Sequence, residues 1–179
     1  ALEFADDKLA EIGMEIGSDV PFCTISKTCL VSGKGEKLEI LPSLPSIWIL
    51  LIKPKDISIS SKWAYNELDK IGIYNKVDIK EIKKAIYARD IELIGKRLFN
   101  DFEYPVGLKY PIIKRIKQLL LKNNALGSAM SGSGPTVFGI FRDKKQGQKA
   151  ISAIRQEIDG YFYLCRNYNR GGDIFWTRN

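Results

Sequence analysis

Hydrophobic residues recur along this chain at two spacings, so the sequence predicts both helices and strands. Leu9, Ile12 and Ile16 follow a helical spacing behind two aspartates and predict a helix over residues 6–16, which Gly17 can end. Trp48 to Lys53 lies in a continuous apolar run that predicts a buried strand. By the same reasoning, further helices are expected from Ser61 or Lys62 to Lys70 and over 79–88, 91–99, 108–122 and 144–156, and further strands over 29–31, 38–41, 126–130, 136–141 and 161–168.

Prolines and glycines divide this pattern into parts. Pro42 and Pro45 indicate a boundary, so we expect one part over residues 1–43 and a second over 44–179. Residues 18–23 read as a turn that leads into β-prone residues. Because strands and helices are mixed without strict alternation, the fold class expected is α+β, with helices covering one face of a sheet.

Charge favours anionic partners. The 179 residues carry 28 Lys and Arg against 21 Asp and Glu, a net charge of +7. The basic residues are interleaved with acidic ones, which is weak support for a nucleic-acid footprint, and we expect no nucleic-acid partner. No apolar run approaches the roughly 20 residues that span a bilayer, so no membrane partner is expected either.

Histidine and cysteine content narrows the chemistry. The chain has no histidine, which excludes a Ser-His-Asp triad and a histidine-ligated zinc site in these residues, and we assign no metal ligand. Acid–base chemistry must then come from Asp, Glu, Lys or Tyr. The three cysteines show no C-x-x-C spacing and are read as buried, reduced thiols of a cytoplasmic protein.

The first candidate for a binding site is Ser131-Gly132-Ser133-Gly134, which lies between two predicted strands. Glycines let backbone N–H groups converge on an anion, and the serine hydroxyls add donors. The segment matches neither a P-loop nor a Rossmann pattern. A hairpin turn that needs glycine for its dihedral angles is the competing interpretation.

Two further groups of residues could carry chemistry. Asp19, at a turn beside an apolar run, could accept a proton from an alcohol during phosphoryl transfer, or it could cap the turn. Hydroxyls and lysines on the loop that enters the helix at 61–70 could hold a phosphorylated ligand, or could be capping serines and surface lysines. That second group comprises Ser58, Ser60, Ser61 and Tyr65, flanked by Lys53, Lys55 and Lys62.

The order of these segments resembles that of the GHMP superfamily of small-molecule kinases. The resemblance extends over nearly the whole chain, up to about Tyr168. It rests, in chain order, on Glu11-Ile12-Gly13 with Gly17-Ser18-Asp19-Val20-Pro21-Phe22, on Gly33-Lys34-Gly35-Glu36, on Lys53-Pro54 with Ser58-Ile59-Ser60-Ser61-Lys62 and Tyr65, on Asn100-Asp101-Phe102-Glu103, and on Ala129 to Phe138.

This resemblance implies a fold, a reaction and roles for particular residues. The fold would be the end of a ribosomal-protein-S5-like N-terminal domain followed by a ferredoxin-like C-terminal domain. The reaction would move the γ-phosphoryl group of ATP, with Mg²⁺, to the 2-hydroxyl of 4-diphosphocytidyl-2-C-methyl-D-erythritol, a cytidine diphosphate ester of non-mevalonate isoprenoid biosynthesis. Asp19 would orient or deprotonate that hydroxyl, Ser61 and Tyr65 would contact the substrate with Tyr65 near the cytosine, and Ser131, Gly132, Ser133 and Gly134 would border the phosphates.

These residues lack one part of the superfamily's pattern. They contain neither its N-terminal lysine nor its glycine-rich ATP-binding loop, nor the strands that hold adenine. We therefore expect the C-terminal portion of such a kinase, a truncated or proteolysed piece inactive alone, because phosphoryl transfer depends on neutralising phosphate charge. The strands over 23–41, without sheet partners, are expected to rearrange or to associate between chains.

Other functions remain open at this point. Homoserine, mevalonate or sugar kinases of the same superfamily share the glycine loop, although the segments around Asp19 and at Ser61 and Tyr65 favour the cytidyl substrate. A basic ferredoxin-like module that binds RNA would show aromatic residues exposed on its central strands. A pure interaction domain is the third alternative, and residues 171–179 have no assignment.

Overall fold

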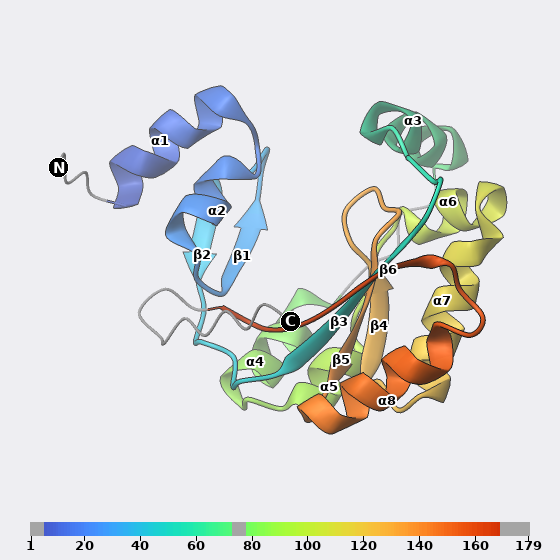
Figure 1. Cartoon of the computed structure of the whole chain (residues 1–179). Coiled ribbons are helices and arrows are strands. Elements are labelled where there is room, and N and C mark those ends of the chain that lie inside the picture. The colour runs from blue at the N-terminus through green and yellow to red at the C-terminus, as the bar shows by residue number, and fades with distance from the viewer. Residues whose placement is uncertain (1–5, 73–77, 169–179) are drawn as a thin grey trace, which may run out of the picture. The chain divides into compact units, whose positions relative to one another are not determined.

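The computed structural model describes residues 6–72 and 78–168 (Figure 1). The described residues up to Leu44, together with Tyr168, form one compact unit, and Pro45–Asn167 form a second. Each unit is described by itself below. The assignment of residues 1–43 and 44–179 to the two domains of the superfamily stays a prediction.

The first unit contains a helix pair and a hairpin. Its elements are α1 (Asp6–Ile16), α2 (Val20–Ile25), β1 (Cys29–Ser32) and β2 (Lys37–Ile40). The helix over 6–16 and the strand pair are confirmed, with β1 and β2 antiparallel and Cys29 opposite Ile40. The ribosomal-protein-S5-like identity of this unit and the association of its strands between chains stay predictions.

The segment expected to be a turn and a strand is instead helical. Pro21 lies in the first turn of α2, where its fixed φ suits a helix and its missing N–H costs nothing. Ser26, at a φ of 50°, ends the helix in the left-handed conformation and donates its backbone N–H to the carbonyl of Phe22. These local end signals outweigh the β propensity of Val20 and Phe22. Cys23 is exposed on this helix, so the expectation of buried thiols is wrong there.

The second unit is built on an antiparallel sheet with the strand order β4-β5-β3-β6. The strands are β3 (Trp48–Pro54), β4 (Gly127–Met130), β5 (Val137–Phe141) and β6 (Gly160–Arg166), as predicted to within a residue or two. Helices connect β3 to β4 and β5 to β6, while β4 and β5 form a hairpin (Figure 1). This order of strands and helices is that of the ferredoxin-like folds, and the α+β class is confirmed.

Most helices of the second unit begin directly after a capping residue. They are α3 (Ser61–Ile71), α4 (Ile79–Tyr87), α5 (Ile91–Lys96), α6 (Glu103–Lys109), α7 (Pro111–Lys122) and α8 (Lys144–Ile154). Ser60, Asp78, Asp90 and Asp143 each accept a backbone N–H of the helix they precede. The helix expected over 108–122 is confirmed from Pro111 onward as α7, but Leu108 and Lys109 belong to α6, because Tyr110 lies at φ −126° and ψ 76° between the two helices. A residue before proline avoids the helical region, so Pro111 starts a new helix.

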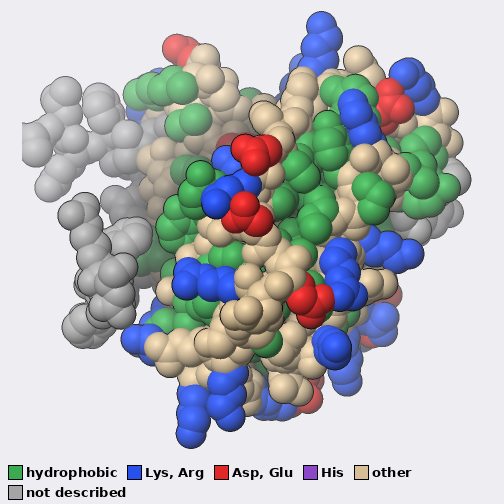
Figure 2. Space-filling model, turned by 45° about the vertical axis from the view of Figure 1, so that its right-hand side comes forward, with side chains coloured by type: hydrophobic (Ala, Val, Ile, Leu, Met, Phe, Trp, Pro, Cys, Tyr) green, Lys and Arg blue, Asp and Glu red, His purple; other side chains and the backbone are tan. Residues whose placement is uncertain are grey.

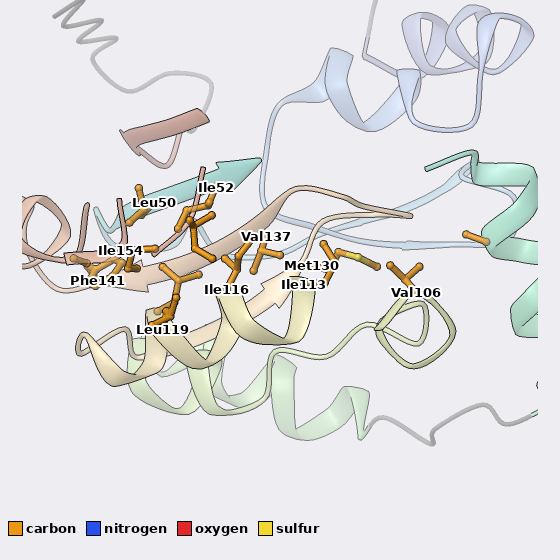
Figure 3. Close-up of a cluster of buried hydrophobic side chains, with 14 residues drawn as sticks. Leu50, Ile52, Val106, Ile113, Ile116, Leu119, Met130, Val137, Phe141 and Ile154 are labelled. Carbon is orange, nitrogen blue, oxygen red and sulfur yellow. The ribbon is translucent and has the colours of Figure 1, made fainter. Parts of the chain in front are cut away.

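One continuous core fixes the sheet to α7 and α8. Ile113, Ile116 and Leu119 point from α7 toward the strands, where Leu50 and Val137 meet them (Figure 3). All of these side chains are at most 1% exposed. Full burial of one such side chain stabilises a fold by roughly 1.5–3 kcal/mol, so this layer holds the strands and their connecting turns in place.

The opposite face of the sheet is also contacted by a helix, at its β4 edge. A Cβ placed on Gly127 would lie 2.0 Å from the carbonyl oxygen of Gly95 in α5. Gly139, which lies opposite Ser128 in the hairpin, approaches Leu120 of α7 instead. Side chains alternate between faces along a strand, so α5 and α7 lie on opposite sides. The prediction of helices on one face alone is therefore wrong.

Candidate functional site

The Ser131–Gly134 turn joins β4 to β5, as a hairpin connection does. Ser131 donates its backbone N–H to the carbonyl of Thr136 at 2.8 Å, and Gly134 donates to the carbonyl of Ser131 at 2.9 Å. Gly132 and Gly134 have φ angles of 54° and 85°. Both lie in the region that favours glycine, so the turn needs its glycines for conformation whatever else it does.

The same turn leaves hydrogen-bond donors available. The backbone N–H groups of Gly132 and Ser133 donate to no residue within 6–72 and 78–168. Ser131 and Gly132 are exposed, and Ser133 and Gly134 are half-buried. Unpaired amides beside serine hydroxyls on a tight turn form a suitable cradle for an anion.

The start of α3 lies against this turn. Ser60 caps the helix by accepting the N–H of Trp63, with 3.4 Å between nitrogen and oxygen. The next residue, Ser61, has its hydroxyl oxygen 2.9 Å from that of Ser133. Either hydroxyl can donate this bond, so the pair can adjust to a ligand that donates or accepts.

Tyr65 lies one helical turn beyond Ser61, on the same face of α3. Its ring packs at 84° to the ring of Phe102, with 4.8 Å between the centroids. The side chain nevertheless remains 58% exposed. A supported but exposed aromatic ring can stack on a planar ligand.

The segment from Asn100 to Glu103 connects these features, although no functional role was predicted for it. Asn100 donates its side-chain amide to the carbonyls of Met130 and Gly132, at 2.8 Å each. Glu103 accepts the backbone N–H of Met130 at 2.7 Å and pairs with Lys117. The segment matches a superfamily pattern, but a polar residue ahead of a helix is locally indistinguishable from a helix cap, so the sequence alone does not reveal these contacts.

Asp19 belongs to the first unit, directly before α2. It is exposed, and its side chain makes no capping bond to the helix. Among the residues that the structure describes, none donates a hydrogen bond to its carboxylate and no cation pairs with it. The side chain is therefore available to a ligand, as the sequence expectation requires.

The Gly33–Glu36 turn supports the backbone next to Asp19. Gly35 has a φ of 115°, and a Cβ there would lie 2.1 Å from the carbonyl oxygen of Ser18. Glu36 folds back over the turn and accepts the N–H of Lys34 at 2.6 Å. Hydrogen bonds from the backbone N–H groups of Glu36 itself and of Lys34 hold the pKa of the Glu36 carboxyl below its ordinary value. The glycine is thus needed for close approach between two segments of the first unit.

The remaining candidates do not join the turn. Lys55 pairs with Asp159 at 2.8 Å, and this partner raises the pKa of Lys55. Ser58 is exposed and hydrogen-bonds to none of the residues that the structure describes. Lys and Arg side chains are spread over the visible surface with acidic side chains between them (Figure 2), so they form no single basic patch there.

Other features that could indicate function are also located away from these residues. A shallow hollow of about 510 Å³ is lined by residues 155–160 and 162, none of them a candidate. Within residues 6–72 and 78–168, no group of three or more Cys, Asp and Glu is placed to hold a metal ion. In the same part of the chain, no helix combines the length and the apolar character needed to cross a membrane.

Comparisons with known proteins identify a family and related sequences. Residues 82–160 match the family described as GHMP kinases C terminal. The chain is 40% identical over 154 residues to a protein of Caldicellulosiruptor bescii, covering 86% of this chain and 54% of that protein. It is also 40% identical over 176 residues to a protein of Clostridioides difficile, covering 97% of this chain and 58% of that protein. The chain thus spans little more than half the length of these curated relatives.

Solved structures resemble the chain in fold. A crystal structure of 4-(cytidine 5'-diphospho)-2C-methyl-D-erythritol kinase superposes with a TM-score of 0.71 at 20% identity, covering 90% of this chain and 57% of that one. A homoserine kinase from Cytophaga hutchinsonii gives 0.60 at 22% identity, covering 81% and 50%. The fold is therefore shared by kinases that differ in substrate.

Residues 82–160 therefore form a C-terminal domain of the GHMP kinases, a class of small-molecule kinases, and the chain is similar over most of its length to members of that class. Within that class, both sequence relatives at 40% identity bear the name 4-diphosphocytidyl-2-C-methyl-D-erythritol kinase.

Proposed function

We propose that this chain supplies the substrate side of a kinase that phosphorylates the 2-hydroxyl of 4-diphosphocytidyl-2-C-methyl-D-erythritol with ATP, in non-mevalonate isoprenoid biosynthesis. The observation that carries the proposal is the 2.9 Å contact between the hydroxyls of Ser61 and Ser133. It brings the helix assigned to the substrate to the turn assigned to phosphates, as transfer between two bound ligands requires.

The cytidyl substrate is favoured over homoserine or mevalonate for two reasons. Both relatives at 40% identity carry its name, whereas the homoserine kinase is similar in fold alone. The exposed ring of Tyr65, supported at a right angle by Phe102, also suits a nucleobase. Homoserine and mevalonate offer no aromatic ring for it to stack on.

The Ser131–Gly134 turn would border the phosphates. Its unpaired N–H groups at Gly132 and Ser133 are donors of the kind that phosphate oxygens accept. Mg²⁺, when bound, would neutralise phosphate charge, and we assign it no ligand in this chain. The positive net charge of +7 further favours two anionic ligands.

Asp19 would act on the accepting hydroxyl. A carboxylate with no other partner among the described residues can accept a hydrogen bond from an alcohol and orient its oxygen for attack. The 179 residues alone are expected to turn over no ATP, because the family's glycine-rich ATP-binding loop is not among them.

The test is a binding titration of this chain with 4-diphosphocytidyl-2-C-methyl-D-erythritol, with mevalonate and homoserine as competitors. Stacking on an aromatic side chain contributes about 1–3 kcal/mol per base, so Tyr65→Ala is expected to weaken binding by roughly tenfold or more. Tyr87→Ala is the matched control, because Tyr87 is 60% exposed on α4 and has no assigned role.

Selective binding that Tyr65→Ala weakens and Tyr87→Ala leaves unchanged would support the proposal. Equal binding of mevalonate or homoserine would move the chain to another GHMP kinase. Binding that neither tyrosine affects would remove the assigned role of α3.

A further inference from the structure

We propose that Asn100 is a positioning residue that turns the Ser133 amide toward a bound phosphate. The inference rests on the proposed phosphate role of the Ser131–Gly134 turn. It concerns a residue that touches no ligand itself and acts through the backbone of that turn.

Asn100 holds the turn at two points. Its amide nitrogen lies 2.8 Å from the carbonyl oxygen of Met130 and 2.8 Å from that of Gly132. A primary amide has two N–H bonds, so one side chain satisfies both carbonyls. The two bonds span the entry to the turn and fix the orientation of two of its peptide groups.

The orientation of each peptide follows from its geometry. In a trans peptide, the C=O and N–H groups point in opposite directions. The Met130 carbonyl faces Asn100, so the N–H of Ser131 must point away from it, and that N–H indeed bonds to Thr136 at 2.8 Å. By the same rule, holding the Gly132 carbonyl directs the N–H of Ser133 away from Asn100. No described residue accepts this second N–H.

The side chain of Asn100 is itself fixed. Its oxygen accepts the backbone N–H of Phe102 at 2.9 Å, so a flipped amide would set an oxygen against two carbonyls. Phe102 also packs on Tyr65, and Glu103 holds the N–H of Met130. The segment 100–103 therefore sets the phosphate turn and the aromatic ring in one arrangement.

Only an asparagine meets these requirements at this position. Aspartate keeps the acceptor for Phe102 but removes both donors, and alanine removes all three bonds. Without them, the Gly132–Ser133 peptide is free to rotate, since glycine resists rotation least. An anion would then have to fix the peptide on binding, which weakens its affinity.

The experiment is a titration of the isotope-labelled chain with inorganic tripolyphosphate, followed by NMR through the backbone amides of Gly132 and Ser133. In the unmodified chain, both resonances are expected to shift on titration. In Asn100→Ala, the affinity is expected to fall by about tenfold, which corresponds to about 1.4 kcal/mol. Asn123→Ala is the matched control, because Asn123 donates its amide to the carbonyl of Leu119 at 2.8 Å in α7.

A loss of stability alone would affect both variants, whereas loss of positioning affects only Asn100→Ala. Asn100→Asp supplies a second readout without any ligand: the Ser133 amide resonance is expected to move and to broaden. If the unmodified chain shows no response at Gly132 and Ser133, the phosphate role of the turn fails, and the inference fails with it. If the chain responds and Asn100→Ala responds equally, the inference alone is overturned.

Discussion

Gly134 offers the sharpest test of how the Ser131–Gly134 turn is packed. It has a φ of 85°, and a Cβ added there would lie 2.6 Å from the sulfur of Met130 and 3.2 Å from the Cδ1 of Ile59. Gly132, two residues earlier, has a φ of 54° and meets nothing within 4 Å. Gly134→Ala and Gly132→Ala therefore share the backbone strain and differ in the available space.

The expected costs follow from these two terms. A left-handed conformation costs a residue with a Cβ about 1–2 kcal/mol, and both variants incur this loss. Overpacking adds roughly 1–3 kcal/mol, toward the lower end here because the Met130 side chain can shift. We expect Gly132→Ala to lower the free energy of unfolding by about 1 kcal/mol and Gly134→Ala by about 2–3 kcal/mol.

The assay is urea unfolding followed by tryptophan fluorescence. A Trp176→Phe background leaves the signal to Trp48 and Trp63, both in the second unit, so the transition reports on the unit that contains the turn. Equal destabilisation by the two substitutions would refute the reasoning, because it would mean that Met130 and Ile59 do not confine Gly134. A larger loss for Gly132→Ala would contradict the conformation assigned to the turn.

Two further predictions concern packing and thiol reactivity. Gly127→Ala would set a Cβ 2.0 Å from the backbone carbonyl oxygen of Gly95, so we expect the free energy of unfolding, measured by thermal unfolding, to fall by about 3 kcal/mol. In the control Gly107→Ala, the added Cβ meets nothing within 4 Å, and no loss is expected. Equal melting temperatures for the two variants would disprove the α5–β4 contact. Burial raises the pKa of Cys165, which lowers its reactive thiolate fraction, so iodoacetamide at mildly alkaline pH should label exposed Cys23 first in peptide mass spectra. Labelling of both thiols at one rate would contradict the burial of Cys165.

Much of the second unit was predictable because its signals are local. The helix from Ser61 to Ile71 begins after a capping serine and ends before Gly72, which is left-handed at a φ of 63°. Buried strands such as β3 appear as continuous apolar runs bounded by proline. In these places, propensity, pattern and end signals all indicate one structure.

The errors arose where short-range signals conflict. Residues 20–25 have β-prone side chains, but a proline in the first turn and a left-handed Ser26 make them helical. The helix expected over 108–122 was begun three residues too early, before Tyr110, and α6 was not predicted. Periodicity alone does not detect a break that depends on the residue before a proline.

The contacts between the candidate site residues were not predictable from the sequence. Ser61 and Ser133 are 72 positions apart, and nothing in either segment alone indicates that their hydroxyls meet. Asn100 and Glu103 belong to a segment that resembles the superfamily pattern, but their hydrogen bonds to Met130 in β4 depend on the tertiary fold. Whether Asp19 acts with these residues stays a prediction.

The backbone donors of the Ser131–Gly134 turn have a consequence for mutational scanning. The N–H groups of Gly132 and Ser133 survive every ordinary substitution of those residues except proline, so alanine replacement of the serines would remove only hydroxyls. A scan confined to the turn would then underestimate its importance. The largest losses of ligand affinity would instead appear on substitution of Asn100, thirty-two positions before Gly132. These losses would be mistaken for effects on folding unless ligand binding is measured separately.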